Sequence, residues 1–429
     1  MASQVNPPRG MRDFLPADKA RREHILSVIR HNFREHGFDE IETPVVEDSD
    51  RLHAGLGGDN EKLAFAVMKR SLDKDDLQRA ADTGEYLELA DLGLRFDLTV
   101  PLARFYATHR AELSAVFRSI QIAPVWRAER PQKGRFRQFV QCDIDIIGEG
   151  GPLAEIELIT ATAAALEALG FTGANACTIR INDRRILRSL TRRMQIAESD
   201  YERALIVIDK QDKIGTTGVV KELAELGIGE ENIISLMLPS LVAIAGDGWE
   251  LLELPEGAPA WLDVDAYRDL LAIRDAVGDS VRLVFSPNLV RGMGYYTGTI
   301  FEIAHPALPY SLGGGGRYDG MIGRFLGSEV PAAGISLGFE RLVDLVELPE
   351  DENANAVALV YDADVAPPQL AALKSELIAS GVRTTLAKRT RNTTTQLEQL
   401  AAAGYPRFAF VAATTVSARE LEIRNISAQ

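Results

Sequence analysis

The stretch that decides the fold is residues 127–137, which read Arg-Ala-Glu-Arg-Pro-Gln-Lys-Gly-Arg-Phe-Arg. Two runs rich in alternating apolar residues flank it, one at 116–126 and the other at 139–147. Pro131 and Gly134 favour a turn between these runs. The pattern therefore predicts two neighbouring strands joined by a basic loop at 130–136.

The charge of this stretch indicates a binding site. It carries five Lys and Arg residues, although the formal net charge of the whole chain is −15. Cations packed this closely repel one another unless an anion neutralises them. A solvated hairpin tip is the alternative interpretation. Strand alternation, however, places Arg127 and Glu129 on one face, which fixes a cation beside an anion and favours a site.

Length and composition indicate a soluble protein of several domains. At 429 residues, the chain is too long for one ordinary core, so we expect two or three domains. The apolar runs are too short to span a membrane, and the first ten residues contain no signal-peptide core. The two cysteines, Cys142 and Cys177, form neither a disulfide framework nor a zinc-site spacing. We therefore expect a cytoplasmic protein without a protein-bound metal site.

Periodicity predicts the order of the elements along the chain. We expect a helix at 18–36, a Pro-bearing strand at 41–47, hairpin strands near 65–70 and 87–92, a strand running into a helix at 94–104, and a helix at 152–170. Residues from about 190 to 272 are predicted to be helical and acidic, and 346–355 to be a linker. Strands alternate with helices from 356 onward, which predicts a small α/β domain at 356–429.

The basic loop resembles motif 2 of the class II aminoacyl-tRNA synthetases and is similar to its version in the histidyl-tRNA synthetase family. The resemblance implies that Arg127 holds the ATP α-phosphate and that Glu129 reads the adenine amino group. A planar guanidinium suits phosphate, which agrees with the first of these roles. The resemblance further implies that the loop contacts the acceptor end of the tRNA through Arg130, Gln132, Lys133 and Arg135.

Two further segments resemble the shared motifs of class II enzymes. Residues 333–342 contain the pair Glu340-Arg341 and resemble motif 3, which implies that Arg341 clamps the ATP γ-phosphate. Taken alone, this segment is a glycine-containing strand that meets a helix. The helix at 18–36 and the strand after it resemble motif 1, the dimerisation element, and this implies a homodimer.

Residues 289–302 form the most specific segment and resemble a histidine-specific motif of the same family. The resemblance implies that Arg291 lies against the α-phosphate and the substrate carboxylate, and that Tyr295 and Tyr296 shape the amino-acid pocket. Aromatic packing around a snorkelling arginine is the alternative. The family motif usually has an aspartate where this chain has Gly294. We therefore expect the local support of Arg291 and Tyr295 to differ.

The second family-specific segment is a glycine-rich run at 313–320, which we expect to form a turn. In it, Tyr318 matches a substrate-contacting tyrosine. The other histidine contacts implied by the resemblance are Asp97, Thr99, Gln141 and Asp145. Asp143 shares a strand face with the last two, and two buried carboxylates so close together would need a cation. We give Asp143 a surface or structural role outside the site.

The resemblance covers essentially the whole chain and implies an α+β fold. The implied catalytic domain, an antiparallel class II sheet flanked by helices, spans 1–345 and includes a helical insertion at about 190–272. A C-terminal α/β domain similar to anticodon-binding domains follows it. The implied function is ATP- and Mg²⁺-dependent ligation of histidine to tRNA(His) through histidyl-adenylate. The alternative is a non-catalytic paralogue that binds histidine and regulates a partner such as ATP phosphoribosyltransferase. Residues 356–429 favour the enzyme, whereas Gly294 and the ending at Gln429 favour the alternative.

Overall fold

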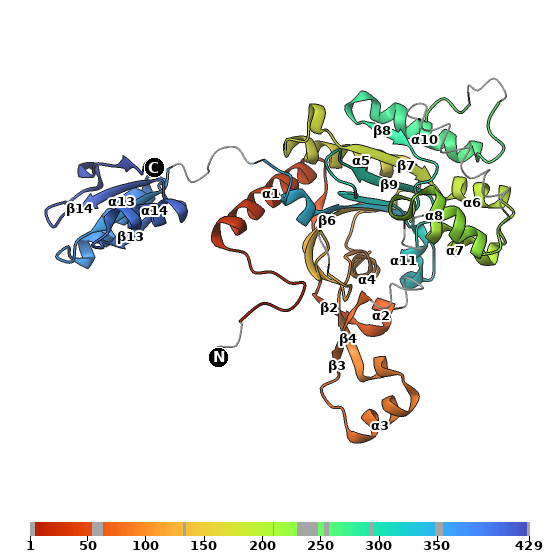
Figure 1. Cartoon of the computed structure of the whole chain (residues 1–429), viewed down its shortest axis with the longest axis horizontal. Coiled ribbons are helices and arrows are strands. Elements are labelled where there is room, and N and C mark those ends of the chain that lie inside the picture. Colours follow the sequence, from red (N-terminus) through yellow and green to blue (C-terminus); the bar gives the residue numbers. More distant parts are fainter. Residues whose placement is uncertain are drawn as a thin grey trace. The chain divides into compact units, whose positions relative to one another are not determined.

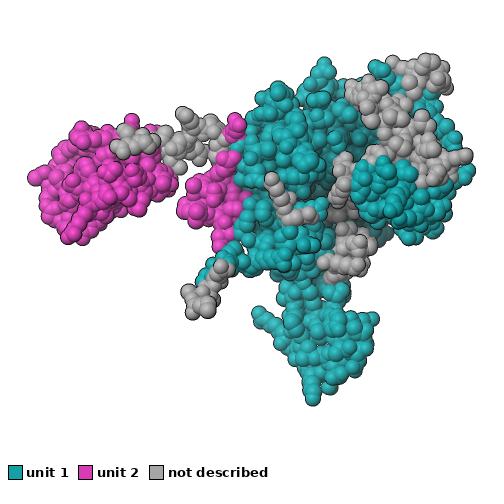
Figure 2. All heavy atoms as spheres, in the orientation of Figure 1, with its two compact units in different colours: residues 1–12, 25–346 teal, residues 13–24, 347–429 magenta. Residues whose placement is uncertain are grey.

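The computed structural model of the chain describes residues 5–53, 63–131, 134–208, 210–229, 248–252, 257–291, 295–347 and 355–426 (Figure 1). The chain divides into two compact units. The first comprises Met1–Arg12 with Ile25–Val346, and the second comprises Asp13–His24 with Glu347–Gln429 (Figure 2). In the described part of the chain, no helix has the length and apolar character needed to cross a membrane.

An eight-stranded sheet forms the centre of the first unit. Its strands are, in spatial order, β1 (Asp39–Glu40), β5 (Phe117–Trp126), β6 (Gln138–Ile147), β11 (Ala332–Gly338), β10 (Gly313–Arg317), β9 (Thr299–Ala304), β7 (Thr178–Asp183) and β8 (Leu283–Phe285). The strands from β5 to β7 are antiparallel, whereas β1 and β8 pair in parallel at the two edges. The predicted α+β class is confirmed.

The hairpin predicted on either side of the basic stretch is confirmed. β5 and β6 pair in antiparallel register from Phe117 opposite Ile147 to Trp126 opposite Gln138. β5 ends one residue before Arg127, whose amide still donates to the Arg137 carbonyl at 2.8 Å. The strand ladder therefore holds the backbone of Arg127, and the loop begins after it.

Two predictions about strands are wrong. Most of the expected strand at 41–47 lies between two strands: β1 ends at Glu40 in the main sheet, and β2 (Val46–Asp48) belongs to a separate three-stranded sheet. Pro44 lies at the crossing and has no amide hydrogen to donate to a ladder. The glycine-rich run at 313–320, expected to be a turn, begins with strand β10. Its backbone lies so close to β11 that a Cβ on Gly315 would be 1.9 Å from the Gly334 carbonyl oxygen.

The remaining elements of the first unit surround this sheet. The three-stranded sheet has the order β2, β4 (Ala90–Leu94), β3 (Phe65–Met68), and it pairs the two hairpin strands predicted in this region. The helices are α1 (Pro16–Glu35, whose first residues belong to the second unit), α2 (Ser49–His53), α3 (Lys74–Thr83), α4 (Thr99–His109), α5 (Leu153–Ala168), α11 (Asp319–Leu326) and α12 (Phe339–Val343). In the sequence, the segment that connects β7 to β8 contains α6 (Arg184–Arg193), α7 (Tyr201–Ile208), α8 (Gln211–Glu225) and α10 (Val264–Val277). These helices begin at Arg184, ahead of the helical stretch that was predicted from about 190.

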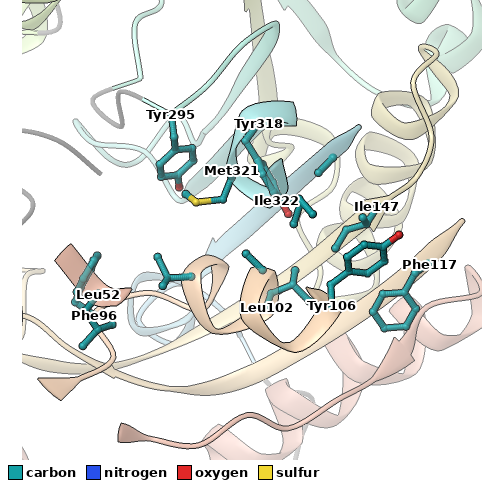
Figure 3. Close-up of a cluster of buried hydrophobic side chains, with 13 residues drawn as sticks. Leu52, Phe96, Leu102, Tyr106, Phe117, Ile147, Tyr295, Tyr318, Met321 and Ile322 are labelled. Carbon is teal, nitrogen blue, oxygen red and sulfur yellow. The ribbon is translucent and has the colours of Figure 1, made fainter. Parts of the chain in front are cut away.

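A buried apolar cluster joins α4 and α11 to the sheet (Figure 3). Phe96 and Leu102 contribute from the α4 side, and Phe117 and Ile147 contribute from β5 and β6. Tyr295 and Tyr318 belong to the same cluster and are 8% and 2% exposed. The core therefore fixes these two rings before any ligand binds.

The C-terminal sheet of the second unit has the order β13 (Thr384–Lys388), β12 (Val357–Tyr361), β14 (Arg407–Val411), β15 (Arg424–Asn425). The first three strands are parallel and β15 is antiparallel. Strand alternation sends Val357 and Leu359 into one core cluster, and Ala358 and Val360 into another. α13 (Pro367–Ala379) covers the first cluster and α14 (Thr393–Ala402) the second. The alternation of strands and helices predicted after residue 356 is confirmed.

Candidate functional site

A cavity of about 1370 Å³ in the first unit brings most of the predicted site residues together. Its wall includes Asp97, Thr99, Arg127, Glu129, Arg135, Gln141, Asp145, Arg291, Tyr295, Tyr296, Tyr318 and Arg341. Among the loop residues predicted to contact tRNA, Arg130 is exposed and lies outside the described lining of this cavity. Gln132, Lys133 and Gly294 fall outside the described residues.

Arginines converge at one end of this cavity. Burial lowers the pKa of Arg341, and the positive charges of Arg135, Arg291 and Arg127 lower it further. The Arg341 guanidinium lies 4.8 Å from the centre of the Tyr310 ring. Like charges held this close destabilise one another, so this end of the cavity attracts an anion with several charges.

A backbone carbonyl holds the Arg127 side chain in place, and the Arg135 side chain holds that of Glu129. Arg127 Nε donates to the Phe96 carbonyl at 3.0 Å, and its guanidinium lies 5.0 Å from the centre of the Phe139 ring. Arg135 Nη1 forms an ion pair with Glu129 Oε2 at 3.3 Å, and the backbone carbonyl oxygen of Glu129 accepts a hydrogen bond from Arg137 Nε at 3.0 Å. Strand alternation predicted Arg127 and Glu129 side by side on one strand face, but both residues lie beyond the end of β5, and the cation that pairs with Glu129 is Arg135.

Arg291 is supported by a carboxylate on the sheet. Its Nη1 lies 3.4 Å from Glu302 Oε2, and Arg180 Nη1 lies 3.7 Å from the other oxygen of Glu302. Glu302 on β9 is the cross-strand partner of both Arg180 and Gly314. A Cβ on Gly314 would lie 2.5 Å from the Phe301 carbonyl oxygen and 2.6 Å from Arg291 Nη1, so glycine at this position leaves room for both the neighbouring backbone and the guanidinium.

Glu302 and Arg180 both line the cavity, although neither was predicted from the sequence as a site residue. The signal for Glu302 was a single carboxylate inside the apolar run Thr299–Ala304. Arg180 carried no local signal, because only the pairing of β7 with β9 brings it to Glu302.

Buried carboxylates line another part of the cavity. Asp97 and Asp145 are 1% and 4% exposed. Burial raises the pKa of Asp97 to about 6 and that of Asp145 to about 7. The Tyr318 hydroxyl donates to Asp145 Oδ1 at 2.5 Å, which opposes the shift, whereas the charge of Asp97 adds to it. A cationic ligand beside these groups would favour their ionised forms.

The surface role expected for Asp143 is wrong. Its side chain lines the same cavity, and the residue is only 5% exposed. Burial raises its pKa well above the ordinary value, and the neighbouring charge of Asp145 raises it further. Because residues two apart point to one face of a strand, the alternation that placed Gln141 and Asp145 in the site applied to Asp143 as well.

Glycines on β11 give these side chains their space. Gly334 lies opposite Asp145, and a Cβ there would be 1.9 Å from Asp145 Oδ1. In the described part of the chain, Asp97 Oδ2 and Gln141 Oε1 are buried acceptors without a hydrogen-bond partner. A ligand that donates hydrogen bonds would give both of these acceptors a partner. The cavity therefore suits a polyanion in one part and an ammonium or N–H group in another.

Comparisons with known proteins agree with this chemistry. Residues 10–342 match the family model described as histidyl-tRNA synthetase. The chain is 60% identical over 423 residues to the histidine--tRNA ligase of Leifsonia xyli subsp. xyli (strain CTCB07), covering 97% of each chain. It is 41% identical over 434 residues to the probable histidine--tRNA ligase of Tropheryma whipplei (strain Twist), covering 95% of this chain and 96% of the relative.

Solved structures show the same fold. The crystal structure of histidyl-tRNA synthetase from Nostoc sp. PCC 7120 superposes with a TM-score of 0.76 at 26% identity, over 98% of this chain and 95% of that one. A Bacillus halodurans C structure described as an ATP phosphoribosyltransferase regulatory subunit/histidyl-tRNA synthetase gives a TM-score of 0.71 at 21% identity, over 92% of this chain and 96% of that one. The second likeness concerns the fold alone. From the match over residues 10–342 and the full-length relatives, the chain belongs to the histidyl-tRNA synthetase family of class II aminoacyl-tRNA synthetases.

Proposed function

We propose that this chain ligates histidine to tRNA(His) at the expense of ATP, through a histidyl-adenylate intermediate. The cavity carries the proposal, and the identity to a relative supports it. A single cavity joins the arginine cluster around Arg341 to the buried acceptors Asp97 and Gln141, and the chain is 60% identical to a histidine--tRNA ligase along 97% of its length. A nucleoside triphosphate fits the arginine cluster, and a zwitterionic amino acid fits the buried acceptors.

In the first step, a carboxylate oxygen of histidine attacks the α-phosphorus of ATP. A new P–O bond forms, the bond to the bridging oxygen breaks, and pyrophosphate leaves with that electron pair. Arg127 and Arg291 would stabilise charge at the α-phosphate, while Arg341 would hold the leaving group. The attacking carboxylate is already an anion, so positioning accounts for most of the catalysis and no general base is needed.

In the second step, a hydroxyl of the terminal tRNA ribose attacks the carbonyl carbon of the adenylate. The ester bond to tRNA forms, the hydroxyl proton passes to the departing phosphate, and AMP leaves with the electron pair of the broken C–O bond. Glu129 would hold the adenine through its amino group, so the nucleotide stays in place during the transfer.

Histidine selection would rest on buried polar groups. Asp97, Thr99 and Gln141 lie in the same cavity as the hydrogen-bonded pair Asp145 and Tyr318, and Tyr295 and Tyr296 complete its wall. These groups would pair with the α-ammonium and the imidazole. A side chain of similar size without the imidazole nitrogens would leave buried groups unpaired, which makes polar pockets selective.

Mg²⁺ would enter the site with ATP. The cavity carboxylates Glu129 and Glu340 are already paired, Glu129 with Arg135 and Glu340 with Arg12. Mg²⁺ commonly keeps water and substrate phosphates as ligands, so it fits this site as part of the nucleotide complex. When bound, it would neutralise part of the charge on the departing pyrophosphate.

We also infer a cytoplasmic homodimer in which residues 356–429 form an anticodon-binding-like domain. Helix α1 and the segment 41–47 that follows it support a subunit contact, because they carry the motif 1 resemblance. The separate α/β core of the tail supports a domain of its own. Cys142 and Cys177 remain thiols and are not joined in a disulfide, which suits a reducing compartment.

The test of the proposed function is ATP–pyrophosphate exchange with purified protein. Exchange should require both histidine and Mg²⁺, and glutamine in place of histidine should give none. Tight histidine binding without exchange would replace this proposal with the regulatory paralogue. The Bacillus halodurans C likeness gives that alternative a fold but no further support.

The structure separates two arginines of the basic loop. Arg130 is exposed outside the cavity lining, whereas Arg135 lies in it and pairs with Glu129. We expect R130A to weaken tRNA(His) binding and to reduce the slope of log affinity against log salt by about 1, while exchange stays unchanged. R135A should raise the KM for ATP by about threefold to tenfold, because a cation near the phosphates is lost. Nitrocellulose filter binding at several salt concentrations and exchange kinetics measure the two effects; a raised KM for ATP in R130A would reverse the assignment.

A further inference from the structure

Asp143 is a buried cavity carboxylate to which the proposed mechanism assigns no task. Its side chain faces the same cavity as Gln141 and Asp145. Its carboxylate accepts hydrogen bonds from the Gln141 amide and from the Ser336 hydroxyl. Both of these partners also line the cavity, so the three side chains form one polar group in its wall.

The geometry of this group uses both N–H bonds of the Gln141 amide. Gln141 Nε2 lies 3.3 and 3.2 Å from the two oxygens of Asp143, and 3.0 Å from Ser336 Oγ. Ser336 on β11 is the direct cross-strand partner of Asp143 on β6. Its hydroxyl can therefore accept from Gln141 while it donates to Asp143. In the described structure, the remaining polar atom of Gln141, Oε1, is buried without a hydrogen-bond partner.

A side-chain amide can present either its oxygen or its nitrogen in a given direction, and its surroundings decide which one. A carboxylate accepts hydrogen bonds from the amide nitrogen and repels the amide oxygen. We propose that Asp143, assisted by Ser336, is a positioning residue that holds the Gln141 amide with Oε1 toward the cavity, where it accepts an N–H of the amino-acid substrate. This inference rests on the proposed function and adds a residue to its specificity.

The neighbouring strand leaves room for this arrangement. The β11 residues opposite Gln141, Asp143 and Asp145 are Gly338, Ser336 and Gly334. Two of the three cross-strand positions therefore carry no side chain, and the third carries a small hydroxyl. Ser336 fills the only one of these positions from which a hydroxyl contacts both Gln141 and Asp143.

A double-mutant cycle between Asp143 and Gln141 tests the inference. The isosteric change D143N provides an amide that can pair with either orientation of Gln141. It should raise the KM for histidine in exchange by about tenfold or more, with kcat and the KM for ATP within about twofold of wild type. In a Q141A background, D143N should add less than about twofold, because the group through which it acts is gone. An equal increase in both backgrounds, or an unchanged KM for histidine in D143N, would overturn the proposal.

A charge-preserving swap provides the rescue. In Q141E/D143N, the carboxylate introduced at position 141 accepts from the amide introduced at position 143 with one oxygen and presents the other oxygen to the cavity. The KM for histidine should return to within about threefold of wild type. A KM that stays at the D143N value would show that the orientation of the side chain at position 141 is not what Asp143 controls.

If circular dichroism shows that D143N does not fold, two serine variants extend the test. S336A should raise the KM for histidine by about threefold to tenfold, since one partner of the amide is removed. S119A is the matched control, because Ser119 is the buried cross-strand neighbour of Asp145 on β5 and lies outside the described cavity lining. Equal KM values for the two variants would count against the proposal. Calorimetry measures histidine binding by the same variants without catalysis. If the wild-type protein showed no exchange, the proposed function would be wrong, but the calorimetric series would still test the role of Asp143.

Discussion

Replacing Arg291 with alanine should lower the kcat of histidine-dependent pyrophosphate exchange by about a hundredfold to a thousandfold, with a smaller change in histidine affinity. The guanidinium lines the cavity and is held by Glu302 at 3.4 Å. Negative charge builds around the α-phosphorus as the carboxylate attacks, so a fixed cation stabilises the transition state more than the bound substrates. The missing side chain should therefore affect the rate far more than binding.

The matched control for R291A is R180A. Arg180 pairs with the other oxygen of Glu302 at 3.7 Å, and it also lines the cavity. If the effect of R291A came from an unpaired Glu302, R180A would produce a similar loss. We expect R180A to retain the exchange rate within about threefold. Steady-state exchange and histidine binding by calorimetry separate rate from affinity; an R291A protein with a wild-type rate would remove Arg291 from the catalytic role.

Deleting residues 356–429 should reduce kcat/KM for tRNA(His) charging by about a hundredfold or more, while exchange stays within about threefold. The cavity residues lie between Leu63 and Arg341, before this segment begins. The tail has its own sheet and two core clusters of its own. Activation uses only histidine and ATP, whereas charging needs the tRNA bound along more of its length.

Charging with purified tRNA(His) and exchange in the same preparation measure this separation. Circular dichroism of the truncated protein confirms that the first unit is folded. The combination with R130A provides a second check, because a tRNA contact in the loop and one in the tail should add in free energy. Equal loss of exchange and charging in a folded truncation would show that the tail takes part in activation.

Local sequence pattern determined the elements whose residues are close in the chain. The β5–β6 hairpin followed from two apolar runs around Pro131 and Gly134. The alternation of strands and helices after residue 356 followed from short apolar runs separated by helical spacing, since each of these elements buries its own residues against neighbours in the chain. Most of the residues that motif resemblance selected line one cavity.

Only the tertiary structure decided which distant residues meet. β10 is a strand and not a turn because β9 and β11 pair with its glycines on both sides, and no local pattern shows that pairing. In the same way, β6 and β11 bring Asp143 to Ser336, while β7 and β9 bring Arg180 to Glu302. These contacts join residues far apart in the sequence, and their energies depend on burial and cross-strand distance. Motif resemblance in the sequence therefore selected residues that line the cavity, whereas the packing of the sheet added Asp143, Arg180 and Glu302 to them.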